Sequence, residues 1–242
     1  MANSAQLRKN KKQHKPKNIK SKKDDKLIYD AMLDVKEYLE DRFQNEFANN
    51  QFYITHEKQI SIGFMKKIIL QKKIINHKHF DATHDFDDRN IQPDGGVLLL
   101  KSYSNHEICK VLLISEVKRQ GTNDQLKLEG KPQQSRGNAV ERLGKNLTAV
   151  KTMFMHEKIT PFVCFGWGCD FDHKDTFVDA KIFILNEFFN LNKIFVFKKY
   201  GDSQHNYFSP VSMYFRVKSW QRKEMYDILK EVAETAFRYY TQ

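Results

Sequence analysis

Two carboxylates and one ammonium group lie at the ends of two neighbouring apolar stretches of this 242-residue chain. Asp94 precedes the apolar run 97–101, and Glu116 and Lys118 close the run 108–118. Carboxylate oxygens are the ligands that a hard cation such as Mg²⁺ prefers. Such a cation makes water a better nucleophile and offsets charge on a phosphate, and a lysine beside it can orient the water or neutralise the transition state. The three residues therefore predict a metal-dependent site that cleaves phosphodiesters.

A β-hairpin would bring these side chains together. The polar stretch 102–106 joins the two apolar runs, a pattern that predicts two antiparallel strands. With the turn at its centre, the numbers of paired residues sum to about 209, which places Asp94 opposite a position near Ser115 or Glu116. Because side chains alternate along a strand, Glu116 and Lys118 share one face, whereas Val117 points into the core.

Each half of this pattern also has an ordinary explanation. Asp-Gly-Gly is more often a turn, and Glu-x-Lys is more often a solvated strand face. Either half alone would favour that explanation. Asp94 and Glu116 stand 22 positions apart on runs that can pair, and this combination favours a site. The two glycines after Asp94 let the backbone approach closely or twist sharply.

The segment from Arg136 to Arg142 carries a second pattern. Apolar residues at helical spacing predict a helix over 140–157, so Asn138 and Glu141 also fit an N-terminal capping box. Capping does not explain the arginine on either side. An extended segment that enters a helix can lie in the major groove of DNA, where Asn binds adenine, Arg binds a purine N7 and Ala contacts a thymine methyl.

These residues resemble a known group of enzymes. Pro-Asp at 93–94 with Glu-Val-Lys at 116–118 resembles the PD-(D/E)XK nuclease signature. The longer pattern resembles the EcoRI/MunI group of type II restriction endonucleases, over roughly residues 91–166. It consists of Ile91 to Gly96, Ser115 to Gly121, Gly137 to Arg142, and Lys145 with Asn146.

The resemblance implies a Mg²⁺-dependent homodimer that cuts double-stranded DNA at a short palindrome with an AATT core, beside a cognate DNA methyltransferase. Asp94, Glu116 and the Val117 carbonyl would bind the metal, with Lys118 assisting the attacking water. Glu141 would orient an Arg142 of its own or of the other subunit. The residues expected to contact DNA are Arg119, Arg136, Gly137, Asn138, Ala139, Glu141, Arg142, Lys145 and Asn146.

The base pair outside AATT depends on Arg136. The MunI-like branch has an arginine at this place in the motif, whereas the EcoRI-like branch has a small residue, so CAATTG is favoured over GAATTC. If Arg136 instead grips a phosphate, the site would be a bare or degenerate AATT. Two other functions stay open: a non-specific repair or mobile-element nuclease, and a DNA-binding protein that does not cleave. The intact Asp94, Glu116 and Lys118 disfavour the latter, and the segment 136–142 disfavours the former.

Charge is concentrated at the N-terminus. The chain has a net charge of +11, of which residues 1–23 carry +9 without an acid, leaving +2 for the rest. This segment has almost no apolar residue, so we expect a disordered arm that lies along phosphates. Nuclear targeting, attraction to a membrane surface and a solubilising tail are the competing interpretations.

Length and composition indicate one globular domain over 24–242. No apolar run is long enough to span a bilayer, and the N-terminus lacks the apolar stretch of a signal peptide. Cys109, Cys164 and Cys169 form no disulfide framework, and even with His173 they make a poor zinc site. A reducing cytoplasm fits this usage.

The sequence predicts an α/β fold of the restriction-endonuclease type, a central mixed sheet with the catalytic hairpin and flanking helices. Besides the hairpin and the helix over 140–157, we expect helices over 24–47, 61–75 and 220–240, strands over 51–55, 161–165, 180–185, 193–197 and 211–217, and loops over 77–88 and 119–135. The closing helix should bury Met225, Ile228, Leu229, Val232, Ala236 and Tyr239.

Overall fold

The computed structural model of the protein describes residues 19–71, 89–105, 109–121, 123–132, 138–154, 159–171, 180–181, 184, 206–208 and 213–241. In chain order the elements are α2 (Ile19–Arg42), α3 (Gln44–Asn50), β1 (Phe52–Glu57), β2 (Ile60–Ser61), α4 (Ile62–Gln71), β3 (Asn90–Ile91), β4 (Gly96–Ser102), β5 (Cys109–Arg119), α5 (Asn123–Leu128), α6 (Asn138–Met153), β6 (Phe162–Trp167), the 3₁₀ turn η1 (Cys169–Phe171), β7 (Asn206–Phe208), β8 (Met213–Arg216) and α8 (Arg222–Thr241).

Among the described residues, six strands form one mixed sheet in the order β1-β4-β5-β6-β8-β7. The pairs β1/β4, β4/β5 and β7/β8 are antiparallel, whereas β5/β6 and β6/β8 are parallel. The strands β2 and β3 make a separate two-stranded sheet. Strand β5 therefore lies in the middle of the sheet, between an antiparallel neighbour and a parallel one.

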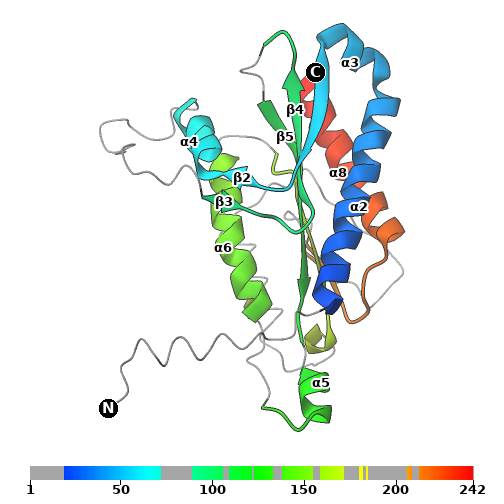
Figure 1. Ribbon diagram of the computed structural model, residues 1–242, viewed down its shortest axis with the longest axis vertical. Coiled ribbons are helices and arrows are strands. Elements are labelled where there is room, and N and C mark those ends of the chain that lie inside the picture. Colours follow the sequence, from blue (N-terminus) through cyan, green and yellow to red (C-terminus); the bar gives the residue numbers. More distant parts are fainter. Residues whose placement is uncertain are drawn as a thin grey trace.

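Helices cover both faces of the sheet and produce three layers (Figure 1). The pleat of β4 shows how: Leu98 and Leu100 pack with α2 and α8, whereas Val97 and Leu99 pack with α4 and α6. All four are buried, because a central strand covered on both faces is apolar throughout. The predicted α/β fold, a mixed sheet flanked by helices, is confirmed.

The predicted hairpin is also present. The partners Val97↔Ile114 and Lys101↔Cys109 give residue numbers that sum to 211 and 210, close to the predicted 209. The sum changes at an irregularity between Leu98 and Leu99.

The closing helix α8 packs on α2 and on the sheet through the apolar face that the sequence predicted. Met225, Leu229, Val232 and Ala236 are buried. Tyr239, assigned to the same face, is 36% exposed, so that assignment was wrong. It belongs to the last turn of α8. In the described part of the chain no helix is both long and apolar enough to cross a membrane.

Several boundaries differ from the predictions. Helix α2 begins at Ile19, so residues 19–23 of the predicted basic arm form its first turn; lysine is a good helix former and no breaker follows position 16. The predicted loop 119–135 contains the short helix α5. The strand predicted over 180–185 is wrong, because its described residues 180, 181 and 184 are helical. The predicted loop 77–88 and strand 193–197 lie outside the described residues.

Candidate active site

Asp94 lies in a tight turn that is hydrogen-bonded to strand β5. The amide of Gly96 donates to the Pro93 carbonyl (3.0 Å), and the amide of Gly95 donates to the Ser115 carbonyl (3.1 Å). A Cβ atom on Gly95 would lie 2.0 Å from the Ser115 Oγ, and Gly96 has a positive φ of 79°. Both positions require glycine, and the close approach that they permit brings Asp94 against the strand that carries the other two site residues.

The side chains of Glu116 and Lys118 point to the same face of β5 and meet Asp94 there. The Lys118 Nζ donates to the Asp94 Oδ2 (2.5 Å) and also to the Glu116 Oε2. The amide of Val117 donates to the Asp94 Oδ2 (3.2 Å), while its side chain packs in the α2/α8 core. The geometry predicted from strand alternation is therefore observed, with two carboxylates sharing one ammonium group.

Burial gives this cluster unusual electrostatics. The Glu116 side chain is 2% exposed. Burial and, to a smaller extent, the nearby Asp94 together raise the pKa of Glu116 to about 7, although the charge of Lys118 acts to lower it. Burial lowers the pKa of Lys118, but the negative charges of Glu116 and Asp94 outweigh it and raise that pKa overall. The cluster therefore holds two carboxylates but only one ammonium group. A second positive charge would be needed for both carboxylates to be fully ionised near neutral pH.

The donor set fits a hard divalent cation. Among the described residues, no group of three or more His, Cys, Asp or Glu side chains is placed to hold a metal. Mg²⁺, however, commonly takes one or two carboxylates and completes its shell with water. Asp94 and Glu116 supply two carboxylates that already converge on a single positive charge.

Three further side chains lie close to the cluster, and the sequence did not predict that they would be there. Asn146 of α6 donates through Nδ2 to the Glu116 Oε1 (2.7 Å). The pKa of Asp25 on α2 is raised by burial and by the charge of Asp94, which places it within electrostatic reach of the site. The sequence offered no signal for Asp25, and it offered Asn146 only as an expected DNA contact.

The third is His56 on β1, which is hydrogen-bonded to the turn that contains Asp94. Its Nε2 lies 2.8 Å from the Gly95 carbonyl, which accepts the hydrogen bond, and its ring stacks on Tyr29 of α2 at 4.4 Å between centroids. Burial lowers the pKa of His56, so the neutral ring donates through Nε2 at physiological pH.

The residues expected to contact DNA are only partly described. Arg136 and Gly137 lie outside the described residues, as do the side chains of Asn138, Ala139, Glu141 and Lys145. Helix α6 begins at Asn138, and the Arg142 side chain on its first turns is exposed. The Arg119 guanidinium, at the end of β5, lies 4.8 Å from the centre of the Trp167 ring.

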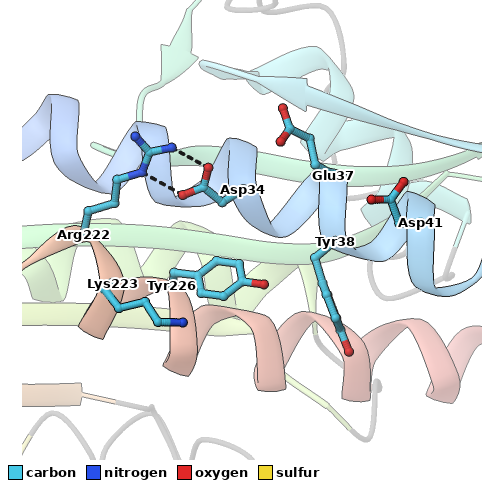
Figure 2. A pocket seen from close by; sticks show the side chains of 7 residues that line it. All are labelled: Asp34, Glu37, Tyr38, Asp41, Arg222, Lys223 and Tyr226. Atoms are coloured by element: carbon cyan, nitrogen blue, oxygen red, sulfur yellow. Dashed lines mark hydrogen bonds and ion pairs between the residues drawn. The ribbon is translucent and has the colours of Figure 1, made fainter.

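A groove of about 590 Å³ lies elsewhere, between α2 and α8 (Figure 2). Two of its charged groups form an ion pair, in which the Arg222 Nε donates to the Asp34 Oδ2 at 2.7 Å. None of its lining residues belongs to the hairpin. They are Asp34, Glu37, Tyr38, Asp41, Arg222, Lys223 and Tyr226. We interpret this groove as part of the packing between the two helices.

A known protein family matches almost the whole chain. The family model described as restriction endonuclease EcoRI matches residues 18–242. The chain belongs to the EcoRI restriction endonuclease family. It is 28% identical over 219 aligned positions to the type II restriction enzyme RsrI of Cereibacter sphaeroides, covering 74% of this chain and 76% of that protein. As a member of this family the protein is a restriction endonuclease that acts on DNA, and the predicted resemblance is confirmed.

Proposed function

We propose that this EcoRI-family protein is a Mg²⁺-dependent type II endonuclease that cuts double-stranded DNA at a palindrome with an AATT core. The observation that carries the chemistry is the convergence of Asp94, Glu116 and Lys118 at one end of the β4/β5 hairpin. Family membership supports the substrate and the site-specific mode of cleavage. Such an enzyme acts in the cytoplasm, beside a methyltransferase that protects the host's own sites.

Each residue of the cluster has a distinct role. Asp94, Glu116 and the Val117 carbonyl would hold Mg²⁺. When bound, the cation offsets charge on the phosphate and makes water a stronger nucleophile. Lys118 is protonated and fixed by two carboxylates, so its ammonium group can orient the attacking water or donate to the phosphate as negative charge develops. The Val117 amide, which donates to Asp94, holds that carboxylate toward the cluster.

The segment that opens α6 would read the bases. A palindrome implies a two-fold homodimer in which each subunit reads one half-site. Asn138, Ala139 and Arg142 match the part of the motif tied to AATT, and Glu141 would orient an arginine. Gly137 would contact DNA as part of the same segment, and Arg119 and Lys145 would add positive charge beside the DNA.

Incubating phage DNA with the protein and Mg²⁺ tests the function. Discrete bands support a site-specific endonuclease, a smear supports a non-specific nuclease, and a gel shift without cleavage supports a DNA-binding protein only. Lys118→Ala should abolish cleavage and leave specific binding largely intact, because the lysine acts on water and the transition state. Glu116→Ala should do likewise through loss of the metal. Near-normal turnover in either variant would remove that residue from the mechanism.

Arg136 would select the outer base pair and favour CAATTG. Its forked donors match guanine O6 and N7, a contact worth about 1–3 kcal/mol of discrimination. Cleavage rates of Arg136→Ala on duplexes that differ only outside AATT decide this point. Selective loss of discrimination at the outer pair supports base reading. A uniform loss across all AATT sites means that Arg136 grips a phosphate.

A further inference from the structure

The hydrogen bond between Asn146 and Glu116 joins helix α6, whose first residues read the bases in the proposed function, to one of the two carboxylates proposed to bind the metal. Both oxygens of Glu116 are engaged: Oε1 accepts from the Asn146 Nδ2 (2.7 Å) and Oε2 accepts from the Lys118 Nζ. The lysine belongs to the same strand as Glu116, but the asparagine belongs to α6. The orientation of this carboxylate therefore depends on where α6 lies against the sheet.

Helix α6 has a well-defined position. Leu143 and Leu147, on either side of Asn146 in sequence, are fully buried, and Val150 one turn later is 2% exposed. They pack with Ile114 on the same face of β5 that carries Glu116. The amide of Asn146 is thus presented to Glu116 by a helix that packs directly against the strand carrying this glutamate.

The same helix begins at Asn138, within the segment that reads the bases in the proposed function. Asn146 lies eight positions after Asn138 along the helix, a rise of about 12 Å. Helix α6 is unbroken over its 16 residues, so a displacement of its first turn would move the helix as one body. A change in how the first turn sits in the major groove therefore reaches the Asn146–Glu116 contact.

We propose that Asn146 is a positioning residue that couples base recognition to cleavage by orienting Glu116 from the recognition helix. The proposal rests on the proposed function and differs from a direct DNA contact, the role that the family motif suggests for this position. On the cognate sequence the amide holds the Glu116 Oε1 in the orientation needed for cleavage. On a sequence with one wrong base pair, α6 sits differently and the bond is weakened.

The test is a double-mutant cycle between Asn146→Ala and one base-pair substitution in the AATT core, with single-turnover cleavage and binding measured separately. Outer partners of metal-ligating groups are worth about 10–100-fold in activity or metal affinity. We expect a loss of about that size on the cognate duplex and a loss several-fold smaller on the substituted duplex. Asn146→Asp, which replaces the donor by a carboxylate, should be at least as impaired.

A binding measurement adds a readout that does not require cleavage. In Ca²⁺, Asn146→Ala should need a higher cation concentration for half-maximal binding of the cognate duplex, whereas its affinity without a divalent cation should match the wild type. Thr148→Ala is the matched control, because Thr148 is an exposed polar residue of α6 that bonds to the Gly144 carbonyl. It should leave both measurements unchanged.

Three outcomes would overturn the coupling. Equal loss of cleavage on both duplexes would mean a merely structural role, and weaker binding without a cation would mean a direct DNA contact. Unchanged cleavage would mean that the hydrogen bond is irrelevant. If the wild-type protein makes no discrete bands in Mg²⁺, the proposed function itself fails, which the Asn146 variants cannot cause.

Discussion

At Glu116 the requirements of a metal site and those of a stable fold are opposed. Its carboxylate is buried, faces the charge of Asp94 and shares Lys118 with it. Ionising a buried group is unfavourable unless its charge is compensated. The arrangement suits a site that is completed by a divalent cation, because the cation supplies the missing positive charge. Without the cation, the same arrangement should destabilise the folded protein.

The pH dependence of stability follows from the raised pKa of Glu116. Between the ordinary carboxyl value of 4.5 and about 7, the folded protein keeps a proton that the unfolded chain has released. Stability therefore falls as pH rises through this window and stays lower above it. Glu116→Gln, which cannot ionise, should stabilise the metal-free protein by up to about 3 kcal/mol at pH 8 and raise its melting temperature there, with little change near pH 4.5.

Thermal unfolding in EDTA at the two pH values checks this expectation. Mg²⁺ should raise the melting temperature of the wild type at pH 8 and narrow its difference from the variant, since a ligand of the folded state stabilises it. An equal effect of the substitution at both pH values, or destabilisation at pH 8, would contradict the assignment of the raised pKa to Glu116.

The core of the site could be predicted at the residue scale, but its surroundings could not. Asp94, Glu116 and Lys118 lie on one hairpin, so strand alternation and a short turn are enough to bring them together. Asp25, His56 and Asn146 come from elements far away in sequence. Their approach depends on how helices and an edge strand pack, which local pattern does not specify.

At the scale of elements, the turn before β4 packs closely against strand β5 because residue 95 is a glycine and has no side chain. A Cβ on Gly95 would lie 2.0 Å from the Ser115 Oγ and 3.0 Å from the Ile28 Cγ1. The Ser115 hydroxyl is itself buried and has no hydrogen-bond partner in the described part of the structure. The contact therefore depends on shape, and it positions Asp94 against β5.

A pair of substitutions tests this fit. Gly95→Ala should destabilise the protein by about 1–3 kcal/mol through overpacking and reduce cleavage by displacing Asp94. Ser115→Ala alone should be neutral or slightly stabilising, because it removes an unsatisfied buried hydroxyl. In the double variant the nearest neighbours of the new Cβ would be at 3.0 and 3.3 Å, so part of the loss should be recovered. Additive effects in urea unfolding would show that Ser115 is not the obstacle.

Prediction of elements succeeded where periodicity was long and failed where it was short. The closing helix and the strands β4, β5 and β6 have strong patterns, and each is present near its expected bounds. The run 180–185 is short and apolar, a length at which periodicity does not separate a strand from a helix. Strand β7 was not predicted, because its three residues pair only through contact with β8.

At the scale of the whole molecule, the layers place the cluster of Asp94, Glu116 and Lys118 where two helices meet the sheet. Helix α6 approaches Glu116 from one face, and α2 brings Asp25 within reach of Asp94 and Lys118. The groove between α2 and α8 is lined by none of the three residues of the cluster. Helix packing thus both buries the core and sets the environment of the three side chains of the cluster.

The concentration of positive charge in the N-terminal segment is also a property of the whole molecule. Helix α2 begins at Ile19, so removing residues 1–18 leaves that helix whole while deleting six lysines and arginines and no acid. If these cations bind phosphates, the truncated protein should bind all duplexes more weakly. The slope of log K against log salt should fall by about 0.9 for each phosphate that the protein no longer neutralises, because fewer counterions are released. Preference between cognate and substituted duplexes should hardly change, since phosphate contacts carry no direct sequence information.

Charge and length are separated by a second variant, in which the six cations of residues 1–18 become glutamine. Fluorescence anisotropy over a salt series should give this variant the same reduced slope as the truncation, because the effect comes from charge alone. A truncated protein that keeps the wild-type affinity and slope would make the segment a solubilising tail. A truncation that flattens the slope while the glutamine variant does not would mean that the backbone of the segment binds the phosphates.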